Sequence, residues 1–234
     1  MMTSIKNKLK QNKLIVAIYM KLYGHKKEVR RVQIAKDTLR NEGFDYLVMI
    51  EDALTNAGAR YFVNFGSLLG LLRSGEFISW DFDIDYGIYI DDSFSWEDLR
   101  KAMNGIGMTL ARQFSFDGLV TEQTYKTEKL TIDFFAHSED ENNSYEYVYF
   151  KKKEYKYDSL DDAHVCRLKM YKFPGITKRK ITNRDIDISV PVDAEKYLAS
   201  IYREDWMIPN PNWISAEGPA WNELDNVIGH GEFF

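Results

Sequence analysis

Cysteine and long apolar runs are scarce in this chain of 234 residues. Cys166 is its one cysteine, so the chain can form no internal disulfide and no cysteine-based zinc site. The apolar run at 14–20 is bounded by lysines and is far shorter than the about 20 residues that a membrane-spanning helix needs. No secretory signal peptide stands out either. These absences favour a reducing, cytoplasmic location.

Positive charge is concentrated in the first 31 residues. The chain has 31 basic and 36 acidic residues, a net charge of −5, yet residues 1–31 alone carry +8. The acidic remainder argues against nucleic acid as a partner, because phosphate backbones are bound through lysine and arginine. Apolar residues at four-residue spacing predict an amphipathic helix in this arm. The arm can pack on the domain, or contact an anionic membrane peripherally at its inner face.

Hydrophobic periodicity predicts one α+β domain over residues 32–234, preceded by the helical arm of residues 1–31. The C-terminal tail is expected to be irregular and aromatic, wrapping the body. The predicted helices are 32–56 (with a break at Gly43), 68–73, 95–103 and 194–202, and the predicted strands are 61–65, 81–90, 109–116, 119–126, 129–136, 145–157 and 164–173.

Paired carboxylates are the main chemical signal. Asp83 and Asp85 lie two positions apart in the predicted strand 81–90, so their side chains leave the same face. Two parallel carboxylates repel each other, and a divalent cation that bridges them would explain the pair. Asp133, in the predicted strand 129–136, could supply a third carboxylate to the same site.

The acidic strand has two other interpretations. Alternating aspartates can protect a solvent-facing edge strand from aggregation. Asp81, Asp83 and Asp85 also imitate the start of a calcium-binding loop, which needs glycine at its sixth position and glutamate at its twelfth. Tyr86 and Asp92 occupy those positions, so the calcium-loop interpretation fails.

A candidate phosphate site precedes the acidic strand. Gly66 and Ser67 follow the predicted strand 61–65 and open the predicted helix 68–73. A turn of this kind directs backbone N–H groups at an incoming anion. An anion site followed by paired aspartates and a distant third aspartate is the plan of a nucleotidyl-transfer site, where two metals stabilise the attacking and leaving oxygens.

These same segments resemble the signature of the LicD/fukutin family. Residues 61–73 read YFVNFGSLLGLLR and residues 75–85 read GEFISWDFDID, where the family typically has GTLLGxxR and GFIPWDDDID. The resemblance continues in LTIDFF at 130–135 and returns in the segment 190–209, so matches are spread over roughly 44–209.

The resemblance implies a nucleotidyltransferase-like core with a mixed β-sheet flanked by helices. It also implies transfer of a substituted phosphate, such as phosphocholine or a phospho-polyol, from a CDP-activated donor to a hydroxyl of a cell-surface glycan or glycolipid. Such chemistry belongs to lipopolysaccharide, capsule or teichoic-acid biosynthesis. The expected cofactor is Mg²⁺ or Mn²⁺, held by Asp83, Asp85 and Asp133, the last of which could instead take the acceptor proton.

The resemblance assigns further roles around these ligands. Gly66 and Ser67 would contact donor phosphate, and Asp81 would orient the metal ligands. Arg73 would neutralise the phosphate, or else form an ion pair with an aspartate. Phe82 replaces an aspartate usual in the family; we expect little effect, because it points to the opposite strand face. Glu76 adds negative charge near the expected donor.

Weaker candidates lie outside the signature. Lys129 is four positions before Asp133, so on a strand it would share the Asp133 face and could touch phosphate. His137 could be a ligand or an acid, although a loop histidine is more often polar surface. The tail residues Trp206, Trp213 and Trp221 could stack on a base or sugar, or pack in the core.

Three rival functions remain at this stage. A true nucleotidyltransferase would attach NMP from an NTP to a small-molecule or sugar acceptor and release pyrophosphate. A sugar transferase with a D-x-D motif is disfavoured, because no strand-rich nucleotide-binding half precedes the motif. A non-catalytic scaffold is disfavoured by the presence of all three carboxylates.

Overall fold

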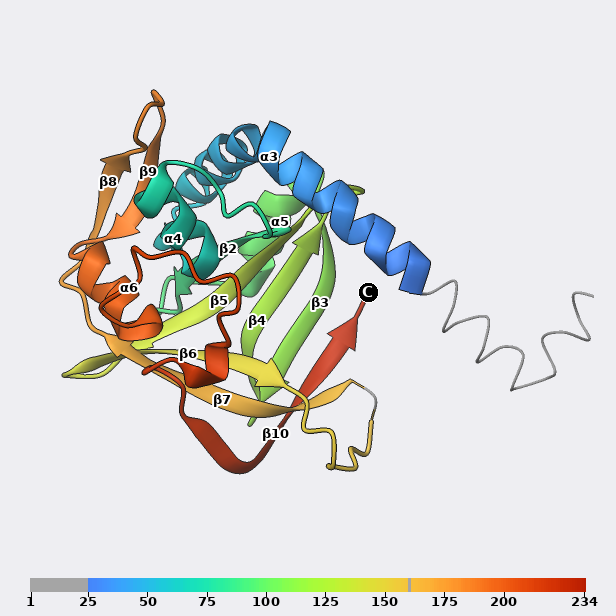
Figure 1. The fold of residues 1–234 in the computed structure, drawn as a ribbon. Helices are drawn as coiled ribbons and strands as arrows, with labels where there is room; N and C mark the ends of the chain where they lie inside the picture. Colours follow the sequence, from blue (N-terminus) through green and yellow to red (C-terminus); the bar gives the residue numbers. More distant parts are fainter. Residues whose placement is uncertain (1–24, 160) are drawn as a thin grey trace, which may run out of the picture.

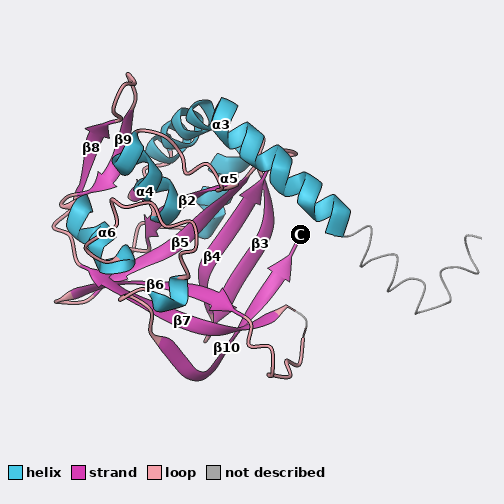
Figure 2. Cartoon of the chain, viewed as in Figure 1, coloured by secondary structure: helices cyan, strands magenta, loops and turns pink. Residues whose placement is uncertain are grey.

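A computed structural model of the chain describes residues 25–159 and 161–234. In these residues the fold is α+β, with one large mixed sheet, a small second sheet and helices around them (Figures 1 and 2). Residues 1–24 of the predicted arm 1–31 lie outside the described part, and residues 25–31 form the beginning of α3. The helices are α3 His25–Asn56, α4 Phe65–Ser74, α5 Trp96–Gly105, α6 Ala194–Tyr202 and the short 3₁₀ helix η2 Ser215–Glu217. In the described part, no helix combines the length and the apolar character needed to cross a bilayer.

The large sheet has the strand order β1-β2-β5-β4-β3-β10-β7-β6. Only β2 and β5 pair in parallel; the other neighbours are antiparallel, and the sheet curls so that β6 also pairs with the end of β5. Helix α3 crosses the molecule beside α5 and β2 (Figure 1). The strands are β1 Tyr61–Val63, β2 Asp83–Tyr89, β3 Thr109–Phe116, β4 Leu119–Lys126, β5 Thr131–Glu139, β6 Asn143–Phe150, β7 Asp162–Tyr171, β8 Ile176–Lys180, β9 Asp187–Pro191 and β10 Glu223–Phe233.

Local sequence signals account for several element boundaries. Ser95 caps α5 by accepting a hydrogen bond from the Asp98 backbone N–H, as the capping-box pattern predicts. Asp117 and Gly118 both have positive φ, which is the turn geometry that joins β3 to β4 with the predicted bounds. Gly75 ends α4 in the left-handed conformation and returns its N–H to the Leu71 carbonyl.

Two expectations for the fold were wrong. The tail is not irregular throughout, because β10 inserts between β3 and β7 in the large sheet. Helix α3 is not broken at Gly43, where the ring of Phe77 packs too closely for a side chain: an added Cβ would lie 2.8 Å from it. The β8–β9 hairpin, which forms the second sheet, was also not predicted.

The core lies between the sheet and helices α3, α4 and α6. Phe62 on β1 is fully buried, and its ring packs against the rings of Tyr89, His137, Phe173 and Tyr197. This cluster ties β1 and β2 to β5 and α6. It lies toward the carboxyl ends of β2 and β5, and the paired aspartates lie at the opposite end of β2.

Candidate metal and phosphate site

Three carboxylates from two strands meet at one point. Because β2 and β5 are parallel neighbours, Asp85 lies directly beside Asp133, with Asp83 two residues earlier on the same face. One oxygen from each of Asp83, Asp85 and Asp133 lies within 4.8 Å of the others. The structure thus brings together the three residues that the sequence pattern singled out.

Burial and mutual repulsion dominate the electrostatics of this cluster. Desolvation, followed by the charges of Asp133 and Asp81, raises the pKa of Asp83 to about 7. Burial and the neighbouring Asp83 raise the pKa of Asp85 well above its usual range. Asp133 is buried, and desolvation raises its pKa as well. The protein therefore places too little positive charge near these carboxylates to compensate their negative charge.

This donor set fits a divalent cation. Several carboxylate oxygens converge within reach of one small ion, and oxygen ligands are those that Mg²⁺ and Mn²⁺ prefer. A bound cation would neutralise charges that are costly to bury together. The residues present therefore suit the expected metal.

Asp133 is held by side chains that the sequence reasoning missed. Thr124 on β4 lies opposite Asp133 and donates a hydrogen bond to its carboxylate. The guanidinium of Arg112 lies 3.7 Å from Asp133 and forms a 2.5 Å ion pair with the buried Glu122. Burial, then the charge of Asp133, raises the pKa of Glu122 to about 7. These residues carry no local motif; only the pairing of β3, β4 and β5 places them here.

Gly66 lies against the acidic cluster at the N-terminal turn of α4. A Cβ at this position would lie 2.7 Å from an Asp81 oxygen and 3.8 Å from an Asp85 oxygen, so only glycine allows this approach. Ser67 is buried, and its hydroxyl accepts the Asp85 backbone N–H at 3.0 Å. The Ser67 hydroxyl therefore supports strand β2 at Asp85.

Asp81 and Arg73 lie on the same side of the site. Burial raises the pKa of Asp81 to about 6, and the positive charge of Arg73 opposes this shift. Arg73 forms no ion pair or hydrogen bond with the described residues, so the alternative of a structural ion pair is not realised there. Its guanidinium remains available to a ligand.

The expectation for Lys129 was wrong. Lys129 precedes β5 rather than belonging to it, and its ammonium pairs with Glu42 on the surface, 2.8 Å away. Glu76 pairs with Arg184 at 2.7 Å, so its charge is partly compensated away from the acidic cluster. Phe82 shares a surface pocket with Lys129, which confirms that it points away from the Asp83 face.

Two cavities open beside the carboxylates and share Gly66, Asp81, Tyr202 and Trp213. The first, called here the Arg73 cavity, has a volume of about 330 Å³. The second, called the Trp221 cavity, has about 380 Å³ and includes Asp83 and Asp85. Trp206, Trp213 and Trp221 thus line cavities, although Trp206 and Trp221 also pack against the core.

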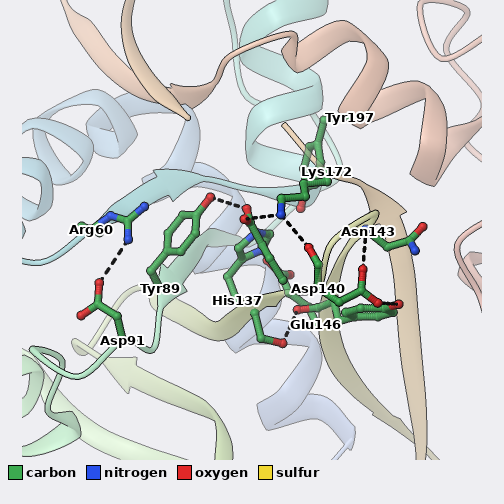
Figure 3. A network of polar contacts seen from close by, with 12 residues as sticks. Arg60, Tyr89, Asp91, His137, Asp140, Asn143, Glu146, Lys172 and Tyr197 are labelled. Atoms are coloured by element: carbon green, nitrogen blue, oxygen red, sulfur yellow. Dashed lines mark hydrogen bonds and ion pairs between the residues drawn. The ribbon is translucent and has the colours of Figure 1, made fainter. Parts of the chain in front are cut away.

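A buried polar network reaches the same end of α4 (Figure 3). Asn64 caps the helix by accepting the Phe65 N–H at 2.8 Å, and its amide donates to Glu146 at 2.7 Å. Glu146 in turn lies 2.9 Å from the Nδ1 atom of His137. The hydroxyl of Tyr197 donates to the Asn64 carbonyl at 2.9 Å. The network therefore links β5, β6 and α6 to the helix that presents Gly66.

His137 does not lie on the surface, because its side chain is fully buried. Burial lowers its pKa, but Glu139 and Glu146 on its two sides outweigh this effect and raise the pKa overall. Glu139 is held in place by the Tyr89 hydroxyl at 2.8 Å. Lys172 lies near the other oxygen of the same carboxylate, at 3.7 Å (Figure 3). His137 supports the fold behind the site and does not reach the acidic cluster directly.

Comparisons with known proteins match the part of the chain that contains the three aspartates. The family model described as LicD/FKTN/FKRP, nucleotidyltransferase domain, matches residues 58–179, which include all three clustered aspartates. Ribitol 5-phosphate transferase FKRP of Mus musculus is 38% identical over 99 residues, 42% of this chain and 17% of that protein. Ribitol-5-phosphate transferase FKTN of Homo sapiens is 22% identical over 198 residues, 81% of this chain and 40% of that protein.

The matched regions cover only part of each relative, but the family match includes the candidate site of this chain. The chain spans less than half the length of these two curated relatives. The family match covers more than half of the chain. It contains the three candidate metal ligands, the strands β2 and β5 that carry them, and Gly66 at the start of α4. The chain belongs to the LicD/FKTN/FKRP nucleotidyltransferase-domain family.

Proposed function

We propose that the protein is a metal-dependent transferase that moves a substituted phosphate from a CDP-activated donor to a hydroxyl of a cell-surface glycan. One observation carries the proposal: Asp83, Asp85 and Asp133 converge within 4.8 Å beside the N-terminal turn of α4. In this proposal the nucleotidyltransferase-like core occupies residues 32–234 as one domain. The names of the relatives favour ribitol 5-phosphate, or a related phospho-polyol, over phosphocholine.

The three aspartates would hold Mg²⁺ or Mn²⁺, which when bound stabilises negative charge on the phosphate oxygens. The N-terminal turn of α4 offers its dipole and backbone N–H groups to the donor phosphate at Gly66. Arg73, which lines the adjoining cavity, offers a guanidinium that matches phosphate geometry. These groups bind and orient the donor.

The bond changes balance without any further reactant. The acceptor oxygen forms a bond to the phosphorus that carries the polyol, and the bond from that phosphorus to CMP breaks. CMP leaves with the electron pair, and the acceptor hydroxyl proton passes to a carboxylate. Asp133 would take this proton if Asp83 and Asp85 alone held the metal, because Thr124 and Arg112 fix its position and burial raises its pKa.

A second candidate is a nucleotidyltransferase, which the description of the matching family model favours. It would use the same carboxylates but break the bond between the α-phosphorus of an NTP and the oxygen that links it to the β-phosphorus. Product identity separates the two functions: CMP for the phosphotransferase, and pyrophosphate for the nucleotidyltransferase.

The test is a product assay with CDP-ribitol, CDP-choline and the four NTPs, each with Mg²⁺, Mn²⁺ or EDTA. We expect metal-dependent CMP release from CDP-ribitol that is lost in Asp83→Asn and Asp85→Asn. Asp92→Asn is the matched control, because Asp92 follows the same strand but is exposed. Release of pyrophosphate from an NTP would favour the second function, and full activity in both cluster variants would refute the metal assignment.

The basic arm carries a separate proposal. We infer that residues 1–31, with their charge of +8, contact anionic membrane where lipid-linked glycans are built. Binding of the full chain and of a variant lacking residues 1–23 to vesicles with and without phosphatidylserine tests this. Equal binding by both chains would contradict it.

A further inference from the structure

We propose that the two cavities divide the substrates of this site, with the nucleotide donor in the Arg73 cavity and the glycan acceptor in the Trp221 cavity. This inference rests on the proposed function. The two cavities meet at the four residues that they share, beside the acidic cluster. An in-line displacement requires the attacking and leaving oxygens to lie on opposite sides of the phosphorus. Two cavities that meet at the carboxylates suit such an arrangement.

Basic side chains line one of the two cavities. The Arg73 cavity is lined by two guanidinium groups, from Arg73 and Arg203, and by two carboxylates, from Asp81 and Asp205. Arg203 is already engaged, because it donates to the Glu217 carbonyl at 2.7 Å and lies over the ring of Trp213. Arg73 has no such partner among the described residues. A pyrophosphate brings negative charge into an acidic site, so the cavity with an available guanidinium is the one that suits the donor.

The Trp221 cavity has the opposite character. Among its described lining residues the only charged side chains are Asp81, Asp83 and Asp85, and none is basic. A nucleotide diphosphate would find no counter-charge there beyond a metal held by the aspartates. A neutral sugar, in contrast, has hydroxyls that can approach the carboxylates and an apolar face of C–H groups that can be buried.

Aromatic rings form much of the remaining wall, and second rings hold them in place. Trp221 packs on Phe150 with ring centroids 5.2 Å apart. Tyr149 stacks on Phe114 at 4.3 Å, and its hydroxyl bonds to Thr121. Because these rings are packed before any ligand arrives, a sugar that lies on them orders little of the protein. The volume of about 380 Å³ is also within the about 300–1,000 Å³ usual for ligand sites.

Trp213 lies between the two substrates in this arrangement, since it lines both cavities. It belongs to the tail segment between α6 and β10. Tyr202 packs against it, with ring centroids 5.5 Å apart. The tail therefore contributes a wall to each cavity, a role that the family match at residues 58–179 does not cover.

The test measures the two ligands separately, at equilibrium and with Mg²⁺. Calorimetry gives the affinity for CDP-ribitol, and saturation-transfer NMR detects methyl glycosides of glucose, galactose, N-acetylglucosamine and N-acetylgalactosamine. Arg73→Gln should weaken CDP-ribitol binding about tenfold, or about 1.4 kcal/mol, and leave the glycoside signal intact. Trp221→Ala should abolish the glycoside signal and leave CDP-ribitol affinity unchanged, while CMP should not displace the glycosides from the wild type.

Control variants separate these effects from misfolding. Trp221→Phe keeps a ring against Phe150 and should retain the glycoside signal, and Tyr155→Ala removes an exposed ring outside both cavities. Displacement of glycosides by CMP, loss of CDP-ribitol affinity in Trp221→Ala with a wild-type melting temperature, or no signal from any glycoside would overturn the inference. If the wild type fails to bind CDP-ribitol, the proposed function itself fails.

Discussion

Asn64 connects the buried network to the candidate phosphate site, and its side-chain amide both donates and accepts hydrogen bonds. Its nitrogen donates to Glu146, while its oxygen accepts from the Phe65 N–H and the Tyr197 hydroxyl. Replacement by aspartate keeps the shape and both acceptor bonds, but turns the donor into a second carboxylate oxygen 2.7 Å from Glu146. Asn64→Asp therefore changes one interaction in this network.

The expected cost follows from burial. Asn64 and Glu146 are both fully buried, so water cannot replace the lost bond. A hydrogen bond to a charged group contributes about 1.5–3 kcal/mol, and an unpaired buried charge costs about 3–5 kcal/mol. We expect Asn64→Asp to lower the free energy of unfolding by about 3 kcal/mol, where these two ranges meet. The loss should shrink on acidification, because one proton shared by the two carboxyl groups restores a hydrogen bond.

Urea denaturation of the single and double variants measures this effect. In Asn64→Asp/Glu146→Gln the new amide can donate to the aspartate and still accept from His137, so stability should recover. Donor affinity should follow the same pattern, since Asn64 caps the helix that carries the proposed phosphate site. Wild-type stability in Asn64→Asp, or a double variant as unstable as the single one, would refute the role assigned to this network.

The structure predicts the direction in which three further substitutions change binding or stability. Gly66→Ala would place a methyl group 2.7 Å from an Asp81 oxygen, so calorimetry should show weaker CDP-ribitol binding at a nearly unchanged melting temperature. Gly87→Ala would place a methyl 2.3 Å from the fully buried ring of Phe62, and urea denaturation should show a free energy of unfolding lowered by about 1–3 kcal/mol or more. Burial lowers the pKa of His137, but its two flanking glutamates outweigh this effect and raise the pKa above 6.5. The charged form of His137 therefore stabilises the fold fully below pH 6.5, and this stabilisation is lost as the pH rises through the raised pKa. The stability difference between wild type and His137→Gln should therefore decrease with rising pH, and a difference that grows would contradict this sign.

Local patterns were sufficient to predict most elements and the cluster at their centre. The alternation around Asp83 and Asp85 correctly predicted a strand with both carboxylates on one face. The hairpin at Asp117 and Gly118 was predicted with its observed bounds because the turn chemistry is local. These signals depend on residues within a few positions of one another, so they can be recognised in the sequence alone.

Long-range contacts explain what was missed. Strand β10 follows an irregular aromatic tail, and only its pairing with β3 and β7 makes it part of the sheet. Arg112 and Glu122 meet Asp133 across three strands without any motif. His137 follows the buried strand residues in sequence and was taken for a loop residue, yet β5 continues to Glu139 and buries it. Each of these outcomes depends on strand order, which spacing along one chain does not encode.

The central claim is that Asp83, Asp85 and Asp133 hold the divalent cation that donor binding needs. The most direct measurement is a Mn²⁺ titration followed by the EPR signal of the free ion, with and without CDP-ribitol, for wild type and Asp85→Asn. The wild type should bind Mn²⁺ more tightly when CDP-ribitol is present, and Asp85→Asn should lose both the binding and its dependence on the donor. Equal Mn²⁺ binding by the two proteins, or no effect of CDP-ribitol on the wild type, would contradict the assignment.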